Sequence, residues 1–417
     1  MRIVVAHNFY QQPGGEDQVF AAEVELLRSN GHDVAVFTRH NDSIEGKGRL
    51  TLLKQSIWNH ETSRSLGELV RAHRAEIVHF HNIFPVISPS AYTAAQKNGA
   101  AVVQTLHNYR LLCPGALFYR DGKVCEDCLH QPFAISAIRH KCYRGSLAAT
   151  AATATLYGVH RLARTWHRRV NRFLALSQFG RGKFVEGGLP EDRVGVTSNF
   201  LPTDPGEGDG AGGYALFVGR LTEDKGVSTL LKAWAELNGS IQLRIVGDGP
   251  LRDEVTAMAN RFPNIQYMGR QPSDKVYELM RGAACLVFPS QWYEGQPRTV
   301  IESLAAGTPL LASRLGVLPE MLTEGRNAIF FEADHFQSLA QAATQFFDRA
   351  DRREMRAEAR NTFLNRYTAE KNYGLLLNHY ETARQHFLNR GSVINGTHRA
   401  TAIPDVTDTT TATVAPE

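Results

Sequence analysis

The sequence has few of the features that mark membrane, secreted and nucleic-acid-binding proteins. No stretch reaches the roughly 18 consecutive apolar residues that a membrane span needs. The formal net charge is only +4, which is too small to indicate nucleic acid as a partner. Residues 1–10 carry a single charge and no small-residue cleavage site, so they do not read as a signal peptide. We therefore expect a cytoplasmic protein.

The sequence does contain enough hydrophobic residues to form packed cores. The chain has 417 residues, of which 43% are hydrophobic, and this length favours two domains. Short runs of Val, Ile and Leu alternate with helical patterns, as in parallel sheets covered by helices on both faces. The predicted strands are Ile3–His7, Val34–Phe37, Ile77–Phe80, Ala101–Leu106, Phe173–Leu176, Val194–Val196, Ala215–Val218, Gln242–Val246, Ile265–Met268, Cys285–Phe288, Leu310–Ser313 and Ala328–Phe331.

The domain boundaries follow from changes in composition. A stretch rich in Gly, Pro and Asp separates the two halves and reads as a linker, while the end of the chain lacks periodicity. We expect an N-terminal domain at 1–201 with a cysteine-containing insert at about 110–145, a linker at 202–213, a C-terminal domain at 214–367, a helix at 368–390 that packs back on the N-terminal domain, and a disordered tail at 391–417.

The segment at 288–309 holds the densest set of candidate functional residues. A buried strand leads into a polar loop and then a helix that Gly307 and Pro309 end. Glu294 lies in the loop, and Glu302 follows on the helix. The N–H groups at the start of this helix suit phosphate, the first carboxylate suits sugar hydroxyls, and the second suits a ribose diol. The alternative, two ordinary surface acids, is disfavoured by the surrounding proline and glycine.

Two further loops also follow predicted strands. Arg220 and Lys225 flank a tight loop that opens a helix, where two cations can neutralise a diphosphate leaving group. The alternative there is a pair of solvated charges. In the first loop, residues 13–16 read Pro-Gly-Gly-Glu, and paired glycines let the backbone approach a ligand closely. The alternative is a plain tight turn.

Together these residues resemble family 4 glycosyltransferases, a retaining family with the GT-B fold, in which two Rossmann-like parallel-sheet domains face each other across a cleft. The resemblance extends to about residue 390 and is most specific over 220–225 and 294–309. It implies an N-terminal acceptor domain and a C-terminal donor-binding domain. It also implies hexosyl transfer from a nucleotide sugar with retained anomeric configuration, as in bacterial exopolysaccharide and glycolipid glycosyltransferases.

The resemblance further implies a role for each motif residue. Glu294 would contact the donor sugar, and Glu302 the ribose. Arg220 and Lys225 would bind the diphosphate and assist its departure. His107, directly after a predicted strand, would face the donor sugar, with a structural loop histidine as the alternative. The backbone around Gly295, Gln296, Thr299 and Val300 would hold the sugar and phosphates, Gly15 would line the donor or acceptor, and Arg270 lies in a loop that resembles the base-contacting segment. For His79 and His81, which alternate along a strand end, we expect structural roles.

The resemblance also implies that no catalytic metal is needed, which fits the cationic pair, and no Asp-x-Asp motif lies in a suitable loop. Four of the five cysteines lie within one 30-residue stretch, a spacing that favours a structural zinc or buried thiols over disulfides. These four are Cys113, Cys125, Cys128 and Cys142. Zinc and reduced, metal-free thiols remain alternatives of similar weight.

A basic stretch follows the cysteines. Ten Lys or Arg and no Asp or Glu occur from Cys128 to Val185. Five of them have helical spacing, which suits a basic amphipathic helix on an anionic membrane surface. These five are Arg161, Arg164, Arg168, Arg169 and Arg172. A solvated helix face is an equal alternative.

The sequence thus predicts a glycosyltransferase that takes a UDP- or GDP-sugar as co-substrate and a saccharide or lipid-linked acceptor. We expect it in the cytoplasm, with peripheral attachment to the inner face of the plasma membrane as one option. Two rival hypotheses remain. A nucleotide-sugar epimerase shares the architecture, and a non-catalytic GT-B scaffold would bind without turnover.

Overall fold

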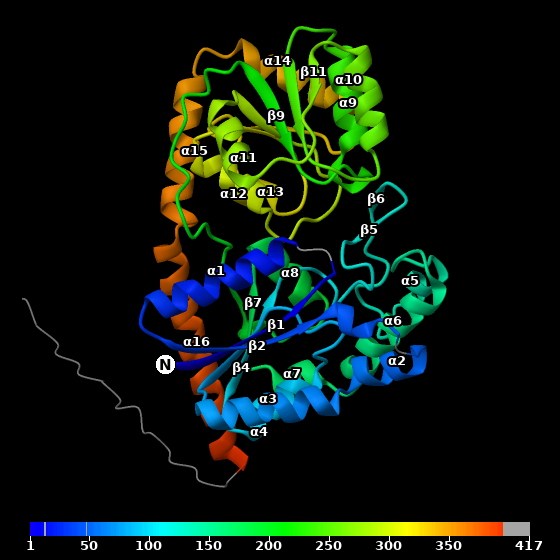
Figure 1. Ribbon diagram of the computed structural model, residues 1–417, viewed down its shortest axis with the longest axis vertical. Coiled ribbons are helices and arrows are strands. Elements are labelled where there is room, and N and C mark those ends of the chain that lie inside the picture. The colour runs from blue at the N-terminus through cyan, green and yellow to red at the C-terminus, as the bar shows by residue number, and fades with distance from the viewer. Residues whose placement is uncertain (12–13, 47, 395–417) are drawn as a thin grey trace, which may run out of the picture.

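The computed structural model describes residues 1–11, 14–46 and 48–394, and it has two α/β halves stacked one above the other (Figure 1). Each half is built on a six-stranded parallel sheet. All twelve predicted strands are present, and the predicted fold class is confirmed. Pro13 of the predicted glycine loop and residues 395–417 of the predicted tail lie outside the described residues. Residues 391–394 continue the last helix.

The first sheet has the order β2-β1-β3-β4-β7-β8. Its strands are β1 (Arg2–Phe9), β2 (Asp33–His40), β3 (Ile77–Phe80), β4 (Ala101–Leu106), β7 (Arg172–Ala175) and β8 (Val194–Val196). The helices of this half are α1 (Gly15–Ser29), α2 (Arg49–Ile57), α3 (His60–His73), α4 (Ser90–Lys97), α5 (Ile135–Arg139), α6 (Leu147–Leu162), α7 (Thr165–Arg169) and α8 (Gln178–Glu186). Buried side chains fill both faces of the sheet, as continuous apolar runs require.

The second sheet has the order β11-β10-β9-β12-β13-β14. Its strands are β9 (Tyr214–Val218), β10 (Gln242–Val246), β11 (Ile265–Tyr267), β12 (Cys285–Phe288), β13 (Leu310–Ser313) and β14 (Ala328–Phe331). The helices that follow are α9 (Val227–Glu236), α10 (Arg252–Arg261), α11 (Ser273–Gly282), α12 (Arg298–Ala305), α13 (Leu318–Met321), α14 (Phe336–Asp348) and α15 (Arg352–Arg366). Strand order reverses at β9/β12, and open sheets bind ligands at such a switch point, beyond the carboxyl ends of the strands.

The last helix returns to the first half of the chain. Helix α16 (Ala369–Ile394) runs down beside the first sheet (Figure 1) and contacts β4 and β7. Its Leu376, Tyr380 and Ala383 are fully buried in the core of that half. The chain therefore crosses between the halves twice, once near residue 202 and once near residue 368.

The basic stretch after the cysteines does not form the single helix that its spacing predicts. Helix α6 ends at Leu162, and Arg164 adopts the left-handed conformation (φ 50°) before the short α7 begins. Arg161 donates to the carbonyl of Leu111, and Arg172 donates to that of Asp192. The predicted amphipathic helix is therefore wrong, because a turn interrupts it and two of its arginines bind backbone within the fold.

The linker at 202–213 is held against the second half by a buried guanidinium. Arg356 on α15 donates to the carbonyl oxygens of Ala283 (3.0 Å), Gly208 (2.8 Å) and Ala306 (3.2 Å). Burial lowers the pKa of Arg356, and the nearby acidic residues of the linker oppose that shift. This one side chain thus joins the linker to two helix ends.

We predict that Arg356→Met destabilises the protein, because three carbonyls would lose a charged donor. The expected cost is about 3 kcal/mol, which corresponds to a fall of roughly 6–12 °C in Tm for a domain of this size. Differential scanning calorimetry would measure it. Arg353→Met on the exposed face of the same helix is the control. Equal melting temperatures for the two variants would contradict the structural role of Arg356.

Candidate functional site

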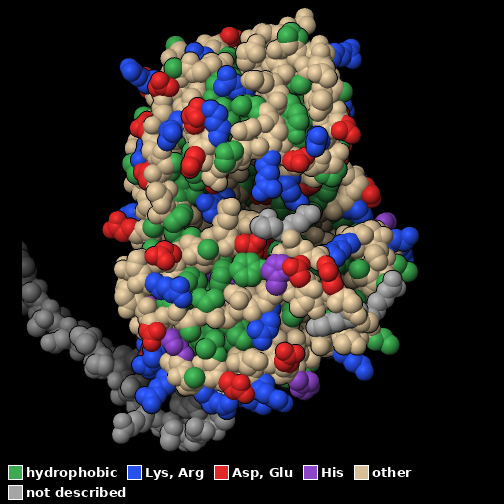
Figure 2. Space-filling model, in the orientation of Figure 1, with side chains coloured by type: hydrophobic (Ala, Val, Ile, Leu, Met, Phe, Trp, Pro, Cys, Tyr) green, Lys and Arg blue, Asp and Glu red, His purple; other side chains and the backbone are tan. Residues whose placement is uncertain are grey.

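A cleft of about 620 Å³ lies between the carboxyl ends of the two sheets. Its lower wall comes from the loops after β1 and β4, and its upper wall from the loops after β9 and β12. A group of Lys and Arg side chains lies just above the groove between the halves in Figure 2. The four loops meet there because the carboxyl ends of parallel strands share one edge of each sheet.

An ion pair occupies the upper wall. The Lys225 Nζ lies 2.6 Å from Glu294 Oε1, and the Ser290 hydroxyl donates to the same oxygen at 2.8 Å. The Glu294 side chain is only 7% exposed and that of Lys225 19%. The ammonium also lies 5.1 Å from the centre of the Trp292 ring. A nearly buried carboxylate needs such partners, so the pair is held in place without a ligand.

The start of helix α12 forms the adjoining part of the wall. Pro297 is the N-cap, and its extended backbone leads into the helix at Arg298. The first N–H groups of a helix carry partial positive charge and have no partners within it. Gln296, just before the cap, accepts from the backbone N–H of Asn199 through its side chain, and its carbonyl accepts from the Asn199 amide at 3.0 Å. This contact ties the helix start to the first half of the chain.

The structure brings most of the predicted site residues together. The cleft is lined by eight of them: Gly15, His107, Arg220, Lys225, Glu294, Gly295, Gln296 and Thr299. Arg220 is exposed, and the described residues give its guanidinium no hydrogen bond or ion pair. Its guanidinium is thus available to an anion beside Lys225.

Three predicted donor contacts do not line the cleft. Arg270 is exposed in the loop after β11, and Val300 is buried in the core of the second half. Glu302 lies on α12 one turn beyond the wall, where the Arg298 Nε donates to it at 3.2 Å and the Tyr277 hydroxyl at 3.4 Å. These contacts leave Glu302 half-buried behind the helix start.

The lower wall carries His107 at the end of β4. Its Nε2 lies 2.9 Å from Nδ1 of His81. Burial and the neighbouring His81 hold the pKa of His107 well below its usual range, so the ring is neutral. A Cβ at Gly295 would lie only 2.6 Å from the His107 carbonyl oxygen. Glycine at 295 therefore allows the two walls to touch.

The motif reasoning did not single out the charged residues beside His107. Glu16, on the first turn of α1, accepts from the Asn108 side chain at 2.5 Å through Oε1, and its buried Oε2 has no recorded partner. Burial raises the pKa of Glu16 to about 6, and Asn108 and Arg110 oppose that shift. Both Glu16 and Arg110 line the cleft. Their sequence signal is position, since Glu16 is the last residue of the motif at 13–16 and Arg110 lies three residues after His107.

The zinc prediction receives no support. Cys113, Cys125, Cys128 and Cys142 are free thiols, and burial raises the pKa of Cys128 to about 12. Within the described ranges, the group of three or more ligand atoms within 4.8 Å of one another comprises other residues, Glu23, His79 and His81.

Hydrogen bonds hold Glu23, His79 and His81 together. Glu23 Oε1 lies 2.6 Å from His79 Nδ1. Two ligands that share a tetrahedral zinc at about 2.0–2.2 Å each would stand roughly 3.4 Å apart. The shorter distance is that of a charge-assisted hydrogen bond.

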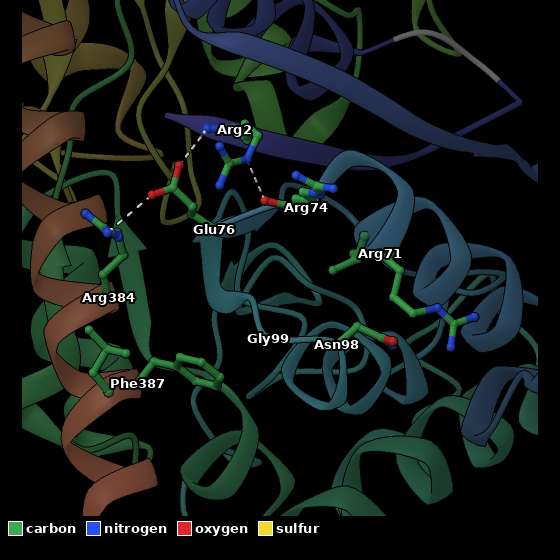
Figure 3. Close-up of a pocket in the computed structure, with 11 residues that line it drawn as sticks. Arg2, Arg71, Arg74, Glu76, Asn98, Gly99, Arg384 and Phe387 are labelled. Atoms are coloured by element: carbon green, nitrogen blue, oxygen red, sulfur yellow. Dashed lines mark hydrogen bonds and ion pairs between the residues drawn. The ribbon is translucent and has the colours of Figure 1, made fainter.

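A second hollow, of about 410 Å³, lies at the opposite end of the first sheet (Figure 3). Its Glu76 accepts from the backbone of Arg2 at 2.9 Å and pairs with Arg384 at 3.2 Å. It lies at the amino ends of β1, β3 and β4. Since open α/β sheets bind ligands at the other edge, the cleft is the stronger candidate site.

Comparisons with known proteins agree with this arrangement. A family model described as Glycosyltransferase Family 4 matches residues 13–205, and one described as Glycosyl transferases group 1 matches residues 209–362. An uncharacterized glycosyltransferase of Methanocaldococcus jannaschii is 26% identical over 45% of this chain and 54% of its own. The phosphatidyl-myo-inositol mannosyltransferase of Mycobacterium leprae is 27% identical over 51% of this chain and 62% of its own. The alignments thus span little more than half of these two relatives.

A solved structure covers more of the chain. The Anabaena protein HepE, crystallised in complex with UDP, superposes with a TM-score of 0.60 at 15% identity, over 94% of this chain and all of its own. At this identity the likeness concerns the fold. No helix in the described part of the chain is both long and apolar enough to cross a membrane.

The position of Lys225 depends on the glycine that follows it, which generates a prediction. Gly226 has φ 72°, and a Cβ there would lie 1.8 Å from the carbonyl oxygen of Pro289, so Gly226→Ala would push the two upper loops apart. We expect the affinity for a nucleoside diphosphate, measured by calorimetry, to fall about tenfold or more, because displacements near 1 Å are costly at such sites.

The control for that variant is Gly239→Ala. Gly239 has φ 93° and open space around its Cβ position, so this variant has the backbone strain without the collision. An equal loss of affinity in both variants would show that contact between the loops does not position Lys225.

Proposed function

This chain belongs to glycosyltransferase family 4 and has the GT-B fold, and on that premise we propose that it transfers a hexose from a nucleotide sugar to a saccharide or lipid-linked acceptor, with retained anomeric configuration. The observation that carries the proposal is the Lys225–Glu294 pair beside Arg220 at the β9/β12 switch point. It offers a carboxylate for a sugar and two cations for a diphosphate in one cleft.

In this proposal the residues of the upper wall bind different parts of the donor. Arg220 and Lys225 bind the diphosphate with the first N–H groups of α12, and they stabilise the charge that develops as the bond from the anomeric carbon to the phosphate oxygen breaks. Glu294 accepts hydrogen bonds from sugar hydroxyls. The acceptor hydroxyl forms the new glycosidic bond, and its proton passes to the departing phosphate. The chemistry uses no metal ion.

The proposed donor is a UDP-sugar. HepE has been solved with UDP and with UDP-glucose, and its fold is shared over nearly the whole chain. The GDP-sugar alternative is an outcome of the test below. For the ribose, we retain Glu302 as a contact, since it lies one turn along α12 from the proposed phosphate site.

The proposed setting is the assembly of an exopolysaccharide or glycolipid. The mannosyltransferase relative of M. leprae acts, by its name, on a phosphatidylinositol. Ile135, Leu147 and Leu162 are exposed apolar side chains on α5 and α6, and Arg164 is exposed two residues after Leu162. We propose that these side chains contact anionic lipid. We expect co-sedimentation with phosphatidylglycerol vesicles but not with phosphatidylcholine vesicles. Equal sedimentation with both would remove membrane attachment from the proposal.

A thermal-shift series tests the donor site directly. UDP and UDP-glucose at millimolar concentration should raise the Tm, because a ligand that binds only the folded state stabilises it. GDP should give a smaller shift. A larger shift with GDP would indicate that the donor is a GDP-sugar. No shift with any nucleotide would favour a scaffold that lacks donor binding.

Two variants in the same series separate binding from chemistry. Glu294→Gln should keep the shift with UDP but reduce release of UDP from UDP-glucose by about 100-fold. Lys225→Ala should weaken the binding of UDP itself. Glu332→Gln, at an exposed carboxylate, is the matched control. Wild-type turnover in Glu294→Gln would contradict the role of this carboxylate.

A further inference from the structure

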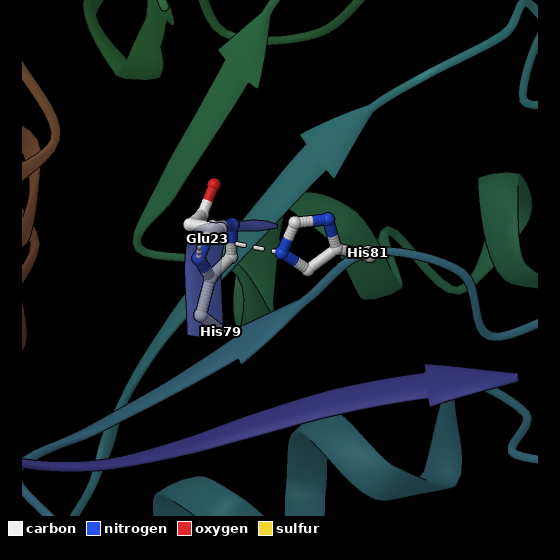
Figure 4. A group of neighbouring side chains, drawn as sticks. All are labelled: Glu23, His79 and His81. Carbon is white, nitrogen blue, oxygen red and sulfur yellow. Dashed lines mark hydrogen bonds and ion pairs between the residues drawn. The ribbon is translucent and has the colours of Figure 1, made fainter. Parts of the chain in front are cut away.

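A line of hydrogen bonds runs from the core of the first half to the cleft. Glu23, on α1, lies 3.3 Å from His81 Nε2 through Oε1, and Figure 4 shows the two side chains facing each other. His81 Nδ1 in turn lies 2.9 Å from His107 Nε2. Glu23 and His81 are both buried. The line therefore links an internal carboxylate to the histidine that lines the cleft.

The charge of the Glu23 carboxylate determines which atom donates in each hydrogen bond of this line. Burial would raise the pKa of Glu23, but His79 and His81 together hold it below its usual range, so Glu23 is ionised and only accepts. His81 must then carry its proton on Nε2, because a lone pair facing the carboxylate would be repelled. Burial lowers the pKa of His81, so its ring is neutral and its Nδ1 is left as an acceptor.

The same logic fixes His107. Its ring is neutral and holds one proton, and the atom that faces His81 is Nε2. Because His81 presents a lone pair, His107 must donate from Nε2, and its Nδ1 carries a lone pair. In the described part of the chain, this Nδ1 has no recorded hydrogen bond and is not among the buried unpaired atoms. It is therefore available to a ligand, and only as an acceptor.

We propose that Glu23 and His81 are positioning residues that hold His107 in the tautomer with an acceptor Nδ1, so that the site selects a donor sugar with a hydroxyl at this point and rejects one with a carboxylate. This specificity rests on the proposed function, in which His107 faces the donor sugar. A hydroxyl can donate to the lone pair, whereas a carboxylate would bring a second lone pair against it. With the C6 group of the donor sugar at this point, the chemical class of donor is a neutral hexose rather than a uronic acid.

The other groups around the line are compatible with this direction of protons. His79 Nδ1 lies 2.6 Å from Glu23 Oε1, and its Nε2 lies 2.7 Å from the Thr105 hydroxyl. The Tyr380 hydroxyl lies 2.8 Å from His79 Nδ1. His7 Nε2 lies 2.7 Å from Asp17 Oδ1, and burial lowers its pKa to about 4. The carboxylate thus keeps its two imidazole partners and has the Tyr380 hydroxyl as a further donor at 3.5 Å, whereas Thr105 and His7 bond elsewhere.

The first test reads the tautomer without any ligand. Long-range proton–nitrogen correlation spectra of the full chain, labelled with ¹⁵N-histidine, distinguish the two neutral tautomers. The His107 signals are those that vanish in His107→Asn. We expect the Nε2–H tautomer at neutral pH. Finding the Nδ1–H tautomer or a protonated ring would overturn the proposal, even if nucleotide binding were intact.

Variants at the middle of the line show whether His81 imposes the tautomer. His81→Asn can place an amide oxygen close to the position of Nδ1, so the His107 signal should be retained. His81→Leu removes the acceptor, and we expect a mixture of tautomers. Thr105→Val is the control, since it breaks the bond to His79 outside the line. An unchanged spectrum in a folded His81→Leu protein would overturn the proposed role of His81.

The second test measures specificity. UDP-glucose and UDP-glucuronic acid differ only in a hydroxymethyl group against a carboxylate. By calorimetry the wild type should prefer UDP-glucose by about tenfold or more, and this preference should shrink in His81→Leu while the affinity for UDP stays constant. Equal affinity of the wild type for both sugars would overturn the specificity. Failure to bind UDP would instead count against the proposed function.

Discussion

A close backbone approach between the two halves sets the geometry of the cleft. Backbone meets backbone there, because a Cβ at Gly295 would lie 2.6 Å from the His107 carbonyl oxygen. The Tyr109 hydroxyl donates to the carbonyl of Glu294 at 3.4 Å, and the Asn199 side chain donates to that of Gln296 at 3.0 Å. These contacts fix the separation of the two sheet edges, so they decide which side chains share the space between them.

Within that space, carboxylates of the same kind have different environments. Burial raises the pKa of Glu16 to about 6, because one of its oxygens has no partner. Glu23 is more deeply buried, yet two imidazoles lower its pKa. Glu294 has an ammonium and a hydroxyl on one oxygen. Burial dominates at Glu16 and the imidazole partners dominate at Glu23, so the two pKa values shift in opposite directions.

The fold was predictable from the sequence because buried parallel strands leave continuous apolar runs, and strand ends then locate the loops. The hairpin of β5 (Tyr119–Arg120) and β6 (Lys123–Val124) was missed, since two-residue strands have no period. The basic helix failed because helical spacing does not reveal a residue such as Arg164 that adopts φ 50°. Zinc ligation and the line through His81 depend on distances between segments that are remote in sequence, and spacing alone does not encode those distances.

On the proposed function, the ion pair in the upper wall couples two parts of the donor. Without a ligand, Lys225 and Glu294 neutralise each other at 2.6 Å, and neither charge is left unpaired in a poorly hydrated place. A diphosphate at Arg220 draws the ammonium toward itself and frees lone pairs of Glu294. Those lone pairs are costly unless sugar hydroxyls replace the ammonium. A nucleoside diphosphate alone therefore breaks the ion pair and leaves Glu294 without a replacement partner. An intact nucleotide sugar supplies partners to both Lys225 and Glu294. The same pair that stabilises the empty cleft thus favours the complete donor over its leaving group.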